Sequence, residues 1–145
     1  MNKTARARRI ASIVEPAYEI FHKGPKCYYC GDSANCMDHC PPLSLVFKVG
    51  TQEMIDSGSK LFKIASCNEC NLLLGNRDLR TPMERVMYLY GAIQRKHSKA
   101  LELPYWDDDE YAELDISLTS VIDNTRLVKS WVNRRLEFME MMHNL

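Results

Sequence analysis

The chain has 145 residues, of which 46% are hydrophobic, and its 19 Lys and Arg balance its 19 Asp and Glu. This length allows one domain with a modest core. No apolar run approaches the roughly 18 to 20 residues of a membrane span, and no apolar segment of a signal peptide follows the basic start. We therefore expect a cytoplasmic protein without a membrane span, whose six cysteines stay reduced instead of forming disulfides.

The balanced total charge hides an uneven distribution. Residues 1–30 hold six Lys and Arg against two acidic residues, and residues 60–100 hold eight against three. Residues 101–123 hold eight acidic residues and no Lys or Arg. Two basic segments suit a phosphate-bearing partner, and the acidic segment suits a basic partner or a face that repels DNA. Ordinary solvated helix faces would give the same pattern.

The first part of the chain predicts a helix and then a short strand. Residues 3–22 place apolar side chains at helical spacing, and Pro16 indicates a kink or a restart. Gly24-Pro25 ends this helix. A short strand is expected over residues 35–39, which Pro41-Pro42 stops.

The middle of the chain predicts short elements followed by a longer helix. Residues 43–60 are expected to contain one short helix near residues 52–56. Residues 61–65 alternate as a strand does. Thr81-Pro82-Met83-Glu84 combines an N-cap, a first-turn proline and a capping-box Glu, which predicts a helix from residue 81 to about 101.

A last helix is expected from about residue 107, where four acidic residues suit the positive end of a helix dipole. Its apolar stripe is long for one globular helix, so a break is expected around Asp123-Asn124. The Met-rich end, with Met139, Met141 and Met142, predicts either core packing or the seam of a homodimer formed through the C-terminal helix.

Two Cys-x-x-Cys pairs are the strongest motif in the sequence. In such a turn the two sulfurs converge, and two turns complete the tetrahedron that structural zinc prefers. We therefore predict a structural Zn²⁺ held by Cys27, Cys30, Cys67 and Cys70. Cys36 and Cys40 are expected to be small buried side chains, with exchange into the ligand set as the alternative.

The order of these elements predicts the fold class. A Cys-x-x-Cys turn, a hairpin and a helix opened by the second pair describe a treble-clef ββα core. The expected fold is therefore α+β, mostly helical overall, with long helices flanking this small zinc core. Within a single domain over residues 1–145, we expect a basic helix (1–24), the zinc-bound core (25–80), a helix (81–103) and one or two C-terminal helices (107–145).

Three segments together resemble a known superfamily. They are Cys27-Tyr-Tyr-Cys30-Gly31, Asp38-His39-Cys-Pro41-Pro42 and Cys67-Asn-Glu-Cys70-Asn71. They look like the HNH (ββα-metal) endonucleases, with a cysteine order similar to phage recombination endonucleases of the endonuclease VII type. Three segments resemble more closely the small HNH-like proteins of phages and prophages: Cys67-Asn-Glu-Cys70-Asn71-Leu-Leu-Leu-Gly75, Thr81-Pro82-Met83-Glu84-Arg85 and Tyr105-Trp106-Asp107. The resemblance covers about residues 25–115.

The resemblance implies a second metal and a reaction. It makes Asp38 and Asn71 ligands of a divalent cation, Mg²⁺ or Mn²⁺, and His39 the general base that activates water. One departure stands out: residues 60–66 lack the Asn that often orients the catalytic His. The alternative interpretation of Asp38-His39 is therefore a relic of a former catalytic site or a structural hydrogen-bonding pair.

These observations support two functions. The first is a metal-dependent endonuclease that hydrolyses DNA phosphodiester bonds, encoded by a phage and acting in the cytoplasm of a bacterial host. The second is a catalytically inactive zinc module that binds nucleic acid or a host protein. In both, exposed arginines would contact phosphate, and the candidates are Arg6, Arg8, Arg9, Arg77, Arg80 and Arg85. Tyr28-Tyr29 could stack on a base or pack on the following helix.

Overall fold

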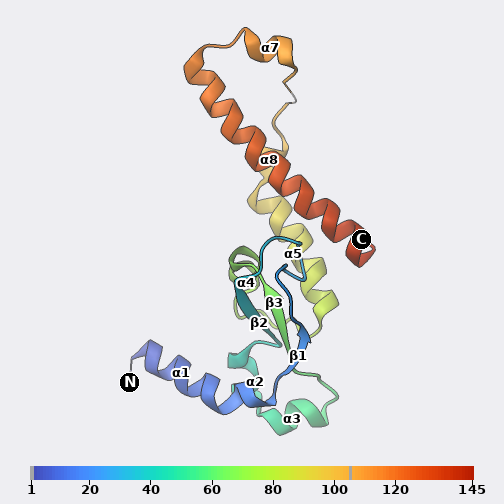
Figure 1. Cartoon of the computed structure of the whole chain (residues 1–145). Coiled ribbons are helices and arrows are strands. Elements are labelled where there is room, and N and C mark those ends of the chain that lie inside the picture. Colours follow the sequence, from blue (N-terminus) through green and yellow to red (C-terminus); the bar gives the residue numbers. More distant parts are fainter. Residues whose placement is uncertain (1, 105) are drawn as a thin grey trace. The chain divides into compact units, whose positions relative to one another are not determined.

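The computed structural model describes residues 2–104 and 106–145, and it is an α+β structure with 61% helix and, in these ranges, one three-stranded sheet (Figure 1). The α+β, mostly helical class expected from the sequence is confirmed. The elements in chain order are α1 (Lys3–Val14), the 3₁₀ turn η1 (Glu15–Ala17), β1 (Glu19–His22), β2 (Cys36–Cys40), α2 (Leu43–Val49), α3 (Thr51–Asp56), β3 (Phe62–Ser66), α4 (Asn68–Leu74), α5 (Pro82–Lys96), α6 (Ser98–Leu101), α7 (Asp108–Ala112) and α8 (Ile116–His143).

The chain divides into two compact units, Met1–Leu89 and Tyr90–Leu145, with the division inside α5. The first unit contains the sheet and both Cys pairs, and it holds 12 Lys and Arg against nine acidic residues. The second unit contains α6, α7 and α8, and it holds seven against ten. The first unit is therefore basic and the second acidic. That the chain forms a single domain stays a prediction.

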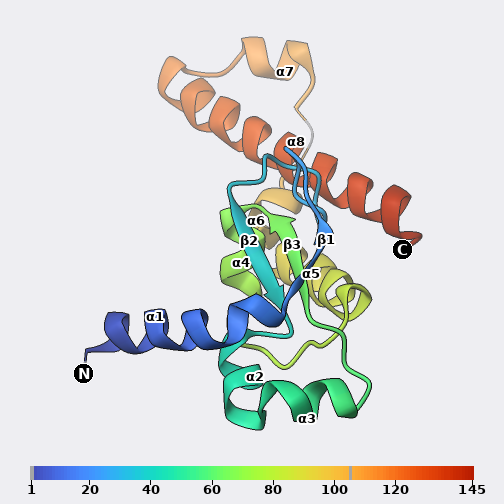
Figure 2. The same ribbon diagram turned by 60° about the horizontal axis from the view of Figure 1, so that its bottom comes forward.

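The sheet has the order β1-β3-β2 (Figure 2). β1 is parallel to β3, whereas β2 is antiparallel to β3 over all five of its residues, with Asp38 opposite Ile64 and His39 opposite Lys63. Both strands predicted from the sequence exist, each shifted by one residue toward the C-terminus. The regular register means that neighbouring side chains on β2 point to opposite faces of the sheet.

The predicted helix over residues 3–22 is too long. Helix α1 ends at Val14, and Pro16 lies in the 3₁₀ turn that follows. Proline has no N–H to continue the helical hydrogen bonds, and Tyr18 then adopts extended backbone angles. Residues 19–22 form β1 instead of a last helical turn, because they pair with a strand some 40 residues later in the chain.

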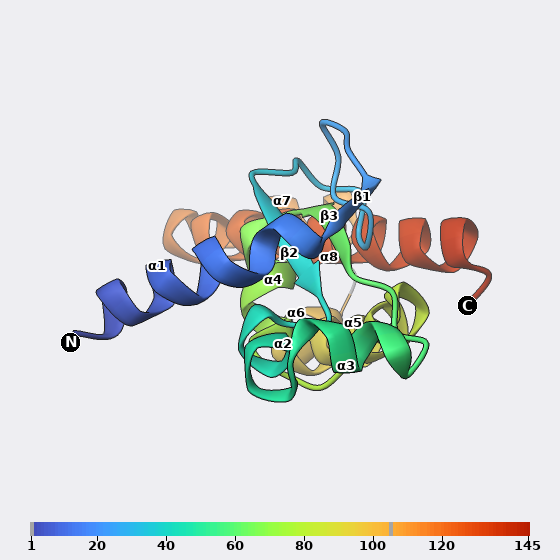
Figure 3. The ribbon, with the colours of Figure 1, turned by 90° about the horizontal axis from the view of Figure 1, so that it is seen from below.

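Residues 43–60 form two helices, α2 and α3, where the sequence predicted only the second. Gly50 separates them with a φ of 104°, a backbone angle that favours glycine. Figure 3 shows the two helices following each other below the sheet. Val46 of α2 and Met54 of α3 form a small core with side chains from α1 and the segments beside it, namely Val14, Tyr18 and Leu61.

The start of α5 confirms two of the three predicted helix signals, the Thr81 N-cap and the first-turn Pro82, but not the capping box. The Thr81 hydroxyl accepts a hydrogen bond of 3.2 Å from the Glu84 N–H, as an N-cap does. The Glu84 carboxylate accepts from the Arg80 N–H at 2.9 Å, one residue before the position that a capping box would use. The helix ends at Lys96, and α6 follows after His97, so the expected helix to residue 101 is interrupted once.

The C-terminal segment also begins as predicted but ends differently. Asp107 and Glu110 form a capping box at the start of α7. The expected break at Asp123-Asn124 is wrong, since α8 runs without interruption through both residues and the break falls before Ile116. Although α8 has 28 residues, no helix in the described ranges combines the length and hydropathy needed to cross a membrane.

Candidate metal centre and its surroundings

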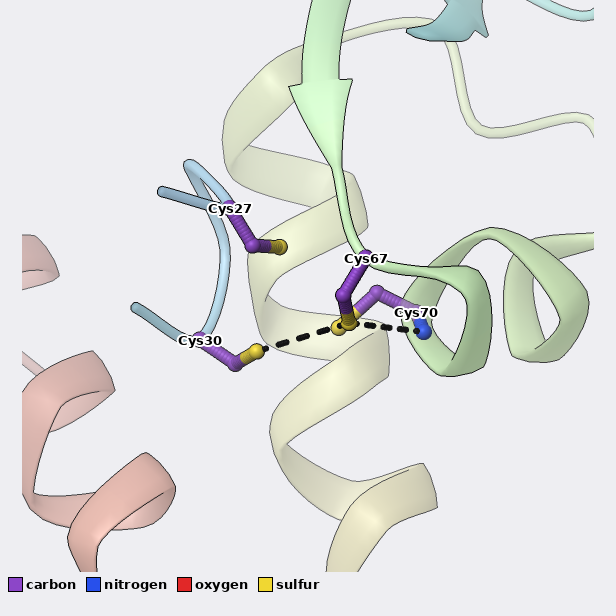
Figure 4. A group of neighbouring side chains, drawn as sticks. All are labelled: Cys27, Cys30, Cys67 and Cys70. Atoms are coloured by element: carbon purple, nitrogen blue, oxygen red, sulfur yellow. Dashed lines mark hydrogen bonds between the residues drawn. The ribbon is translucent and has the colours of Figure 1, made fainter. Parts of the chain in front are cut away.

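The four predicted zinc ligands come from two backbone turns (Figure 4). Cys27 and Cys30 lie on a turn that the Gly31 N–H closes by donating to the Cys27 carbonyl at 3.0 Å, and Gly31 has a φ of 78°. Cys67 follows β3 directly and caps α4, and Cys70 lies in the first turn of that helix. The antiparallel pairing of β2 and β3 places the start of β2, which follows the first Cys turn, beside the end of β3, which precedes the second.

The geometry of the cluster fits one tetrahedral zinc ion. All four sulfurs lie within 4.8 Å of one another, and all four residues are buried. Zinc–sulfur bonds of about 2.3 Å in a tetrahedron require sulfurs about 3.8 Å apart, and the Cys30 and Cys67 sulfurs are 3.7 Å apart. The Cys70 N–H donates to the Cys67 sulfur at 3.4 Å, as is expected for a thiolate at the start of a helix.

The thiols share protons unevenly. Hydrogen bonds from Cys30, Cys67 and Cys70 lower the pKa of Cys27 well below its usual value. The hydrogen bond with Cys27 raises the pKa of Cys67, but those with Cys30 and Cys70 outweigh it and bring this pKa to about 7. The pKa of Cys30 is raised, first by its hydrogen bond to Cys27. A zinc ion would replace this proton sharing with four metal–thiolate bonds.

Cys36 and Cys40 lie outside the cluster. The Cys36 thiol donates to the Ser66 carbonyl at 3.2 Å and is only half-buried, whereas Cys40 is fully buried and donates to the Leu79 carbonyl at 3.7 Å. The expectation of a buried side chain thus holds for Cys40 and in part for Cys36. The alternative ligand set that used either residue has no support in this arrangement.

Asp38 is held in a buried network. Its side chain is almost fully buried, and Arg85 Nη1 donates to both of its carboxylate oxygens at 3.0 Å. The Tyr29 hydroxyl donates to Oδ2 at 2.5 Å. Burial raises the pKa of Asp38 above its usual value, while the Arg85 guanidinium and the Tyr29 hydroxyl counteract that rise. A cation would have to enter a buried site and compete with Arg85 and Tyr29 for these oxygens.

Arg85 extends this network beyond Asp38. Its Nη2 donates to the His39 carbonyl at 3.0 Å, and its Nε donates to the Leu79 carbonyl at 3.0 Å. The side chain has no exposed surface. The prediction that Arg85 contacts phosphate therefore has no geometric basis here, because its guanidinium is buried and each of its three nitrogens donates to a protein oxygen.

His39 has a different set of neighbours from Asp38. Its ring lies edge-on to the Tyr18 ring at 5.0 Å between centroids, and its Nε2 lies 3.4 Å from Glu15 Oε1. That nitrogen is buried and makes no hydrogen bond among the described residues. Asp38 and His39 thus face opposite sides of β2, so the structure does not direct them toward one metal-bound water.

Asn71, the third residue of the proposed catalytic set, lies in α4 directly after the last cysteine. It is half-buried, and its N–H donates to the Cys67 carbonyl at 3.1 Å. The short connection through Cys67 fixes its place relative to β3. The structure does not leave the Asp38 oxygens open beside this helix, because they accept hydrogen bonds from Arg85 and Tyr29.

The other predicted phosphate contacts are on the surface. Arg6, Arg8 and Arg9 are exposed on α1, a helix of 12 residues that contains no Asp or Glu. The Arg77 guanidinium lies over the Tyr88 ring at 4.7 Å, and Arg80 forms an ion pair with Asp78 at 2.7 Å. None of the three arginines of α1 forms an ion pair with a described residue, so α1 offers a cluster of uncompensated positive charge.

Sequence reasoning missed the partners of Asp38 and His39. Tyr29 lies inside the first Cys-x-x-Cys turn, and Arg85 follows the recognised helix start, so both were adjacent to known signals. No local pattern links them to Asp38: Tyr29 lies nine residues away with a turn between them, and Arg85 lies 47 residues away. Glu15 was likewise assigned to a helix interior and not to a contact with His39.

The fold and the cluster together define a class: an α+β protein with a buried four-cysteine site that could hold a metal ion such as zinc. No family model matches the sequence, and neither a curated protein nor a solved structure shows significant similarity to the chain.

Proposed function

We propose that this chain is a zinc-stapled module of the HNH-like, treble-clef type that binds nucleic acid without cutting it. The order of elements supports the treble-clef assignment. A Cys-x-x-Cys turn precedes the antiparallel strands β2 and β3, and the second pair opens α4. In this proposal zinc has a structural task only, since four thiolates leave no coordination position for water.

The occupied Asp38 carboxylate carries the choice of a non-catalytic module. A hard cation such as Mg²⁺ needs free oxygen ligands, and both oxygens of Asp38 already accept hydrogen bonds from the Arg85 guanidinium. Separating Arg85 from Asp38 would cost more free energy than breaking an exposed ion pair. Both charges are buried, and water could not replace the lost hydrogen bonds there. The same contacts give Asp38 a structural role without catalysis.

The basic helix α1 supports nucleic acid as the partner. In Figures 1, 2 and 3 it extends away from the sheet of its own unit, with the N-terminus at its far end. Its exposed arginines have no acidic residue on the same helix to neutralise them. Such a helix can contact successive phosphates, which gives affinity without reading sequence.

The salt dependence of binding tests this interface. We expect Arg6→Gln/Arg8→Gln/Arg9→Gln to weaken duplex DNA binding and to lower the slope of log K against log salt concentration by about 0.9 for each phosphate that the variant no longer neutralises. Fluorescence anisotropy over a salt series measures both quantities. The triple variant Lys60→Gln/Arg95→Gln/Lys99→Gln removes the same charge from exposed sites elsewhere, and it should change the slope much less. Equal slopes in the two variants would refute α1 as the interface.

Endonuclease activity is the second candidate, and the state of His39 favours it. A buried imidazole nitrogen without a hydrogen bond among the described residues, close to a carboxylate, is a suitable general base. Nicking of supercoiled plasmid with Mg²⁺ or Mn²⁺ separates the two functions. Our proposal predicts no nicking, whereas the endonuclease predicts nicking that His39→Ala abolishes while zinc content stays at one per chain. Activity of that kind would replace the non-catalytic proposal.

A further inference from the structure

The basic helix α1 borders a groove that both basic and apolar side chains line. The groove is lined by Arg6, Arg9, Ile10 and Ile13 of α1 and by Phe47 of α2. Arg9 and Ile13 are four residues apart on α1, and Arg6 and Ile10 are as well, so each guanidinium lies one turn from an apolar side chain. We name this feature the α1–α2 groove.

Two of the three apolar side chains of the groove are open to solvent. Val46 and Val14 turn into the small core between α1, α2 and α3, and Ile10 packs against it. Phe47 and Ile13 point the other way, with 44% and 57% of their surface exposed. An aromatic ring beside two guanidinium groups therefore faces solvent at the junction of the helices, where the core does not need it.

This combination points to a nucleic acid with unpaired bases. A phosphate would pair with Arg6 or Arg9, and a base one nucleotide away could stack on the exposed Phe47 ring. Bases of an intact duplex are stacked on one another and cannot reach such a ring. An acidic peptide could use the guanidinium groups, but it has no need of an aromatic face.

We infer that the α1–α2 groove binds single-stranded nucleic acid, or the unpaired part of a branched one, in preference to duplex. The inference rests on the proposed nucleic-acid binding and adds its substrate class. Arg6 and Arg9 supply affinity for any phosphate backbone, while Phe47 supplies the preference for single strands.

Four probes test the preference on the full-length zinc-loaded protein: a short oligothymidine, the same oligonucleotide with abasic sites, a hairpin duplex and poly-glutamate. We expect the oligothymidine to bind more tightly than the abasic strand of equal charge by about fivefold or more, the scale of one base–aromatic stack. Phe47→Leu, which keeps an apolar side chain but removes the ring, should abolish that difference while leaving the abasic affinity unchanged. Ile55→Ala alters a similarly exposed apolar residue on α3 and should have no effect.

The possible outcomes distinguish a failure of this inference from a failure of the proposed nucleic-acid binding. If neither strand nor duplex binds, the proposed function fails and the inference fails with it. If nucleic acid binds but Phe47→Leu leaves the oligothymidine-to-abasic ratio unchanged, only the inference fails. If poly-glutamate binds with an affinity that depends on Phe47 and nucleic acid does not compete, the groove is a site for an acidic protein, and the inference is overturned.

Discussion

Cys67→Ser is expected to abolish zinc binding and to unfold most of the unit Met1–Leu89. Cys67 lies between β3 and α4. Its sulfur contacts the Cys30 sulfur of the first turn and accepts a hydrogen bond from the Cys70 N–H of α4. Structural zinc contributes an apparent binding free energy of about 10–16 kcal/mol in small zinc-folded peptides. The whole folding free energy of a domain is only about 5–15 kcal/mol. A unit whose strands have four or five residues each cannot offset that loss.

Three measurements check this expectation. Elemental analysis should give one zinc per wild-type chain and none in the variant, and Co²⁺ substitution should give the visible absorption of a tetrahedral thiolate site only in the wild type. Limited proteolysis with mass spectrometry should place the new cleavage sites of the variant within residues 1–89. Treating the wild type with a strong chelator should reproduce the same cleavage pattern.

Cys36→Ser is the matched control for this experiment. Its thiol donates to the Ser66 carbonyl, a role that a serine hydroxyl can fill, and it lies outside the four-cysteine cluster. We expect full zinc content and a melting temperature close to that of the wild type. Loss of zinc in Cys36→Ser, or retention of one zinc in Cys67→Ser, would show that the ligand set differs from the one described.

Elements that are set by residues close in sequence were predictable, whereas an element that is set by pairing with a distant strand was not. Each Cys-x-x-Cys turn, the strand at β3 and the Thr81 cap depend on residues within a few positions of one another, and these predictions agree with the structure. The meeting of the two Cys pairs spans 37 residues, and it was predictable because the spacing is typical of zinc ligands. Residues 19–22 have apolar spacing that suits either a helix or an edge strand, and only pairing with β3 decides between them. Such pairing has no local signal, so the helix was extended too far.

Long-range contacts also decided the interpretation of the candidate site. Asp38-His39 next to a zinc pair predicts catalysis by resemblance, but its meaning depends on what surrounds each side chain. Alternation along β2 sends Asp38 toward Tyr29 and Arg85, and it sends His39 toward Tyr18 and Glu15. In α8, by contrast, Asp123-Asn124 costs only a fraction of a kcal/mol per residue in helix propensity. Weak local signals of that size do not end a helix whose neighbouring turns are favourable.

Asp38→Asn is expected to destabilise the unit Met1–Leu89 by about 3–5 kcal/mol, the usual cost of leaving one member of a buried ion pair without its partner. The Arg85 guanidinium would then remain buried with two carbonyl partners and no counter-charge. Chemical denaturation of the zinc-loaded protein measures the change. Asp56→Asn, an exposed acidic residue on α3, should change stability by less than about 0.5 kcal/mol.

The double variant Asp38→Asn/Arg85→Met completes a thermodynamic cycle. Because it removes both charges, it should be less destabilised than the sum of the two single variants, with a coupling of about 1–3 kcal/mol. A catalytic cation site at Asp38 predicts a different effect of Asp38→Asn on stability. If Asp38 were kept for metal binding, Asp38→Asn would fold as well as the wild type, and Mg²⁺ or Mn²⁺ would raise the melting temperature only when Asp38 is present. The cycle therefore decides whether this carboxylate belongs to the fold or to a reaction, independently of any nuclease assay.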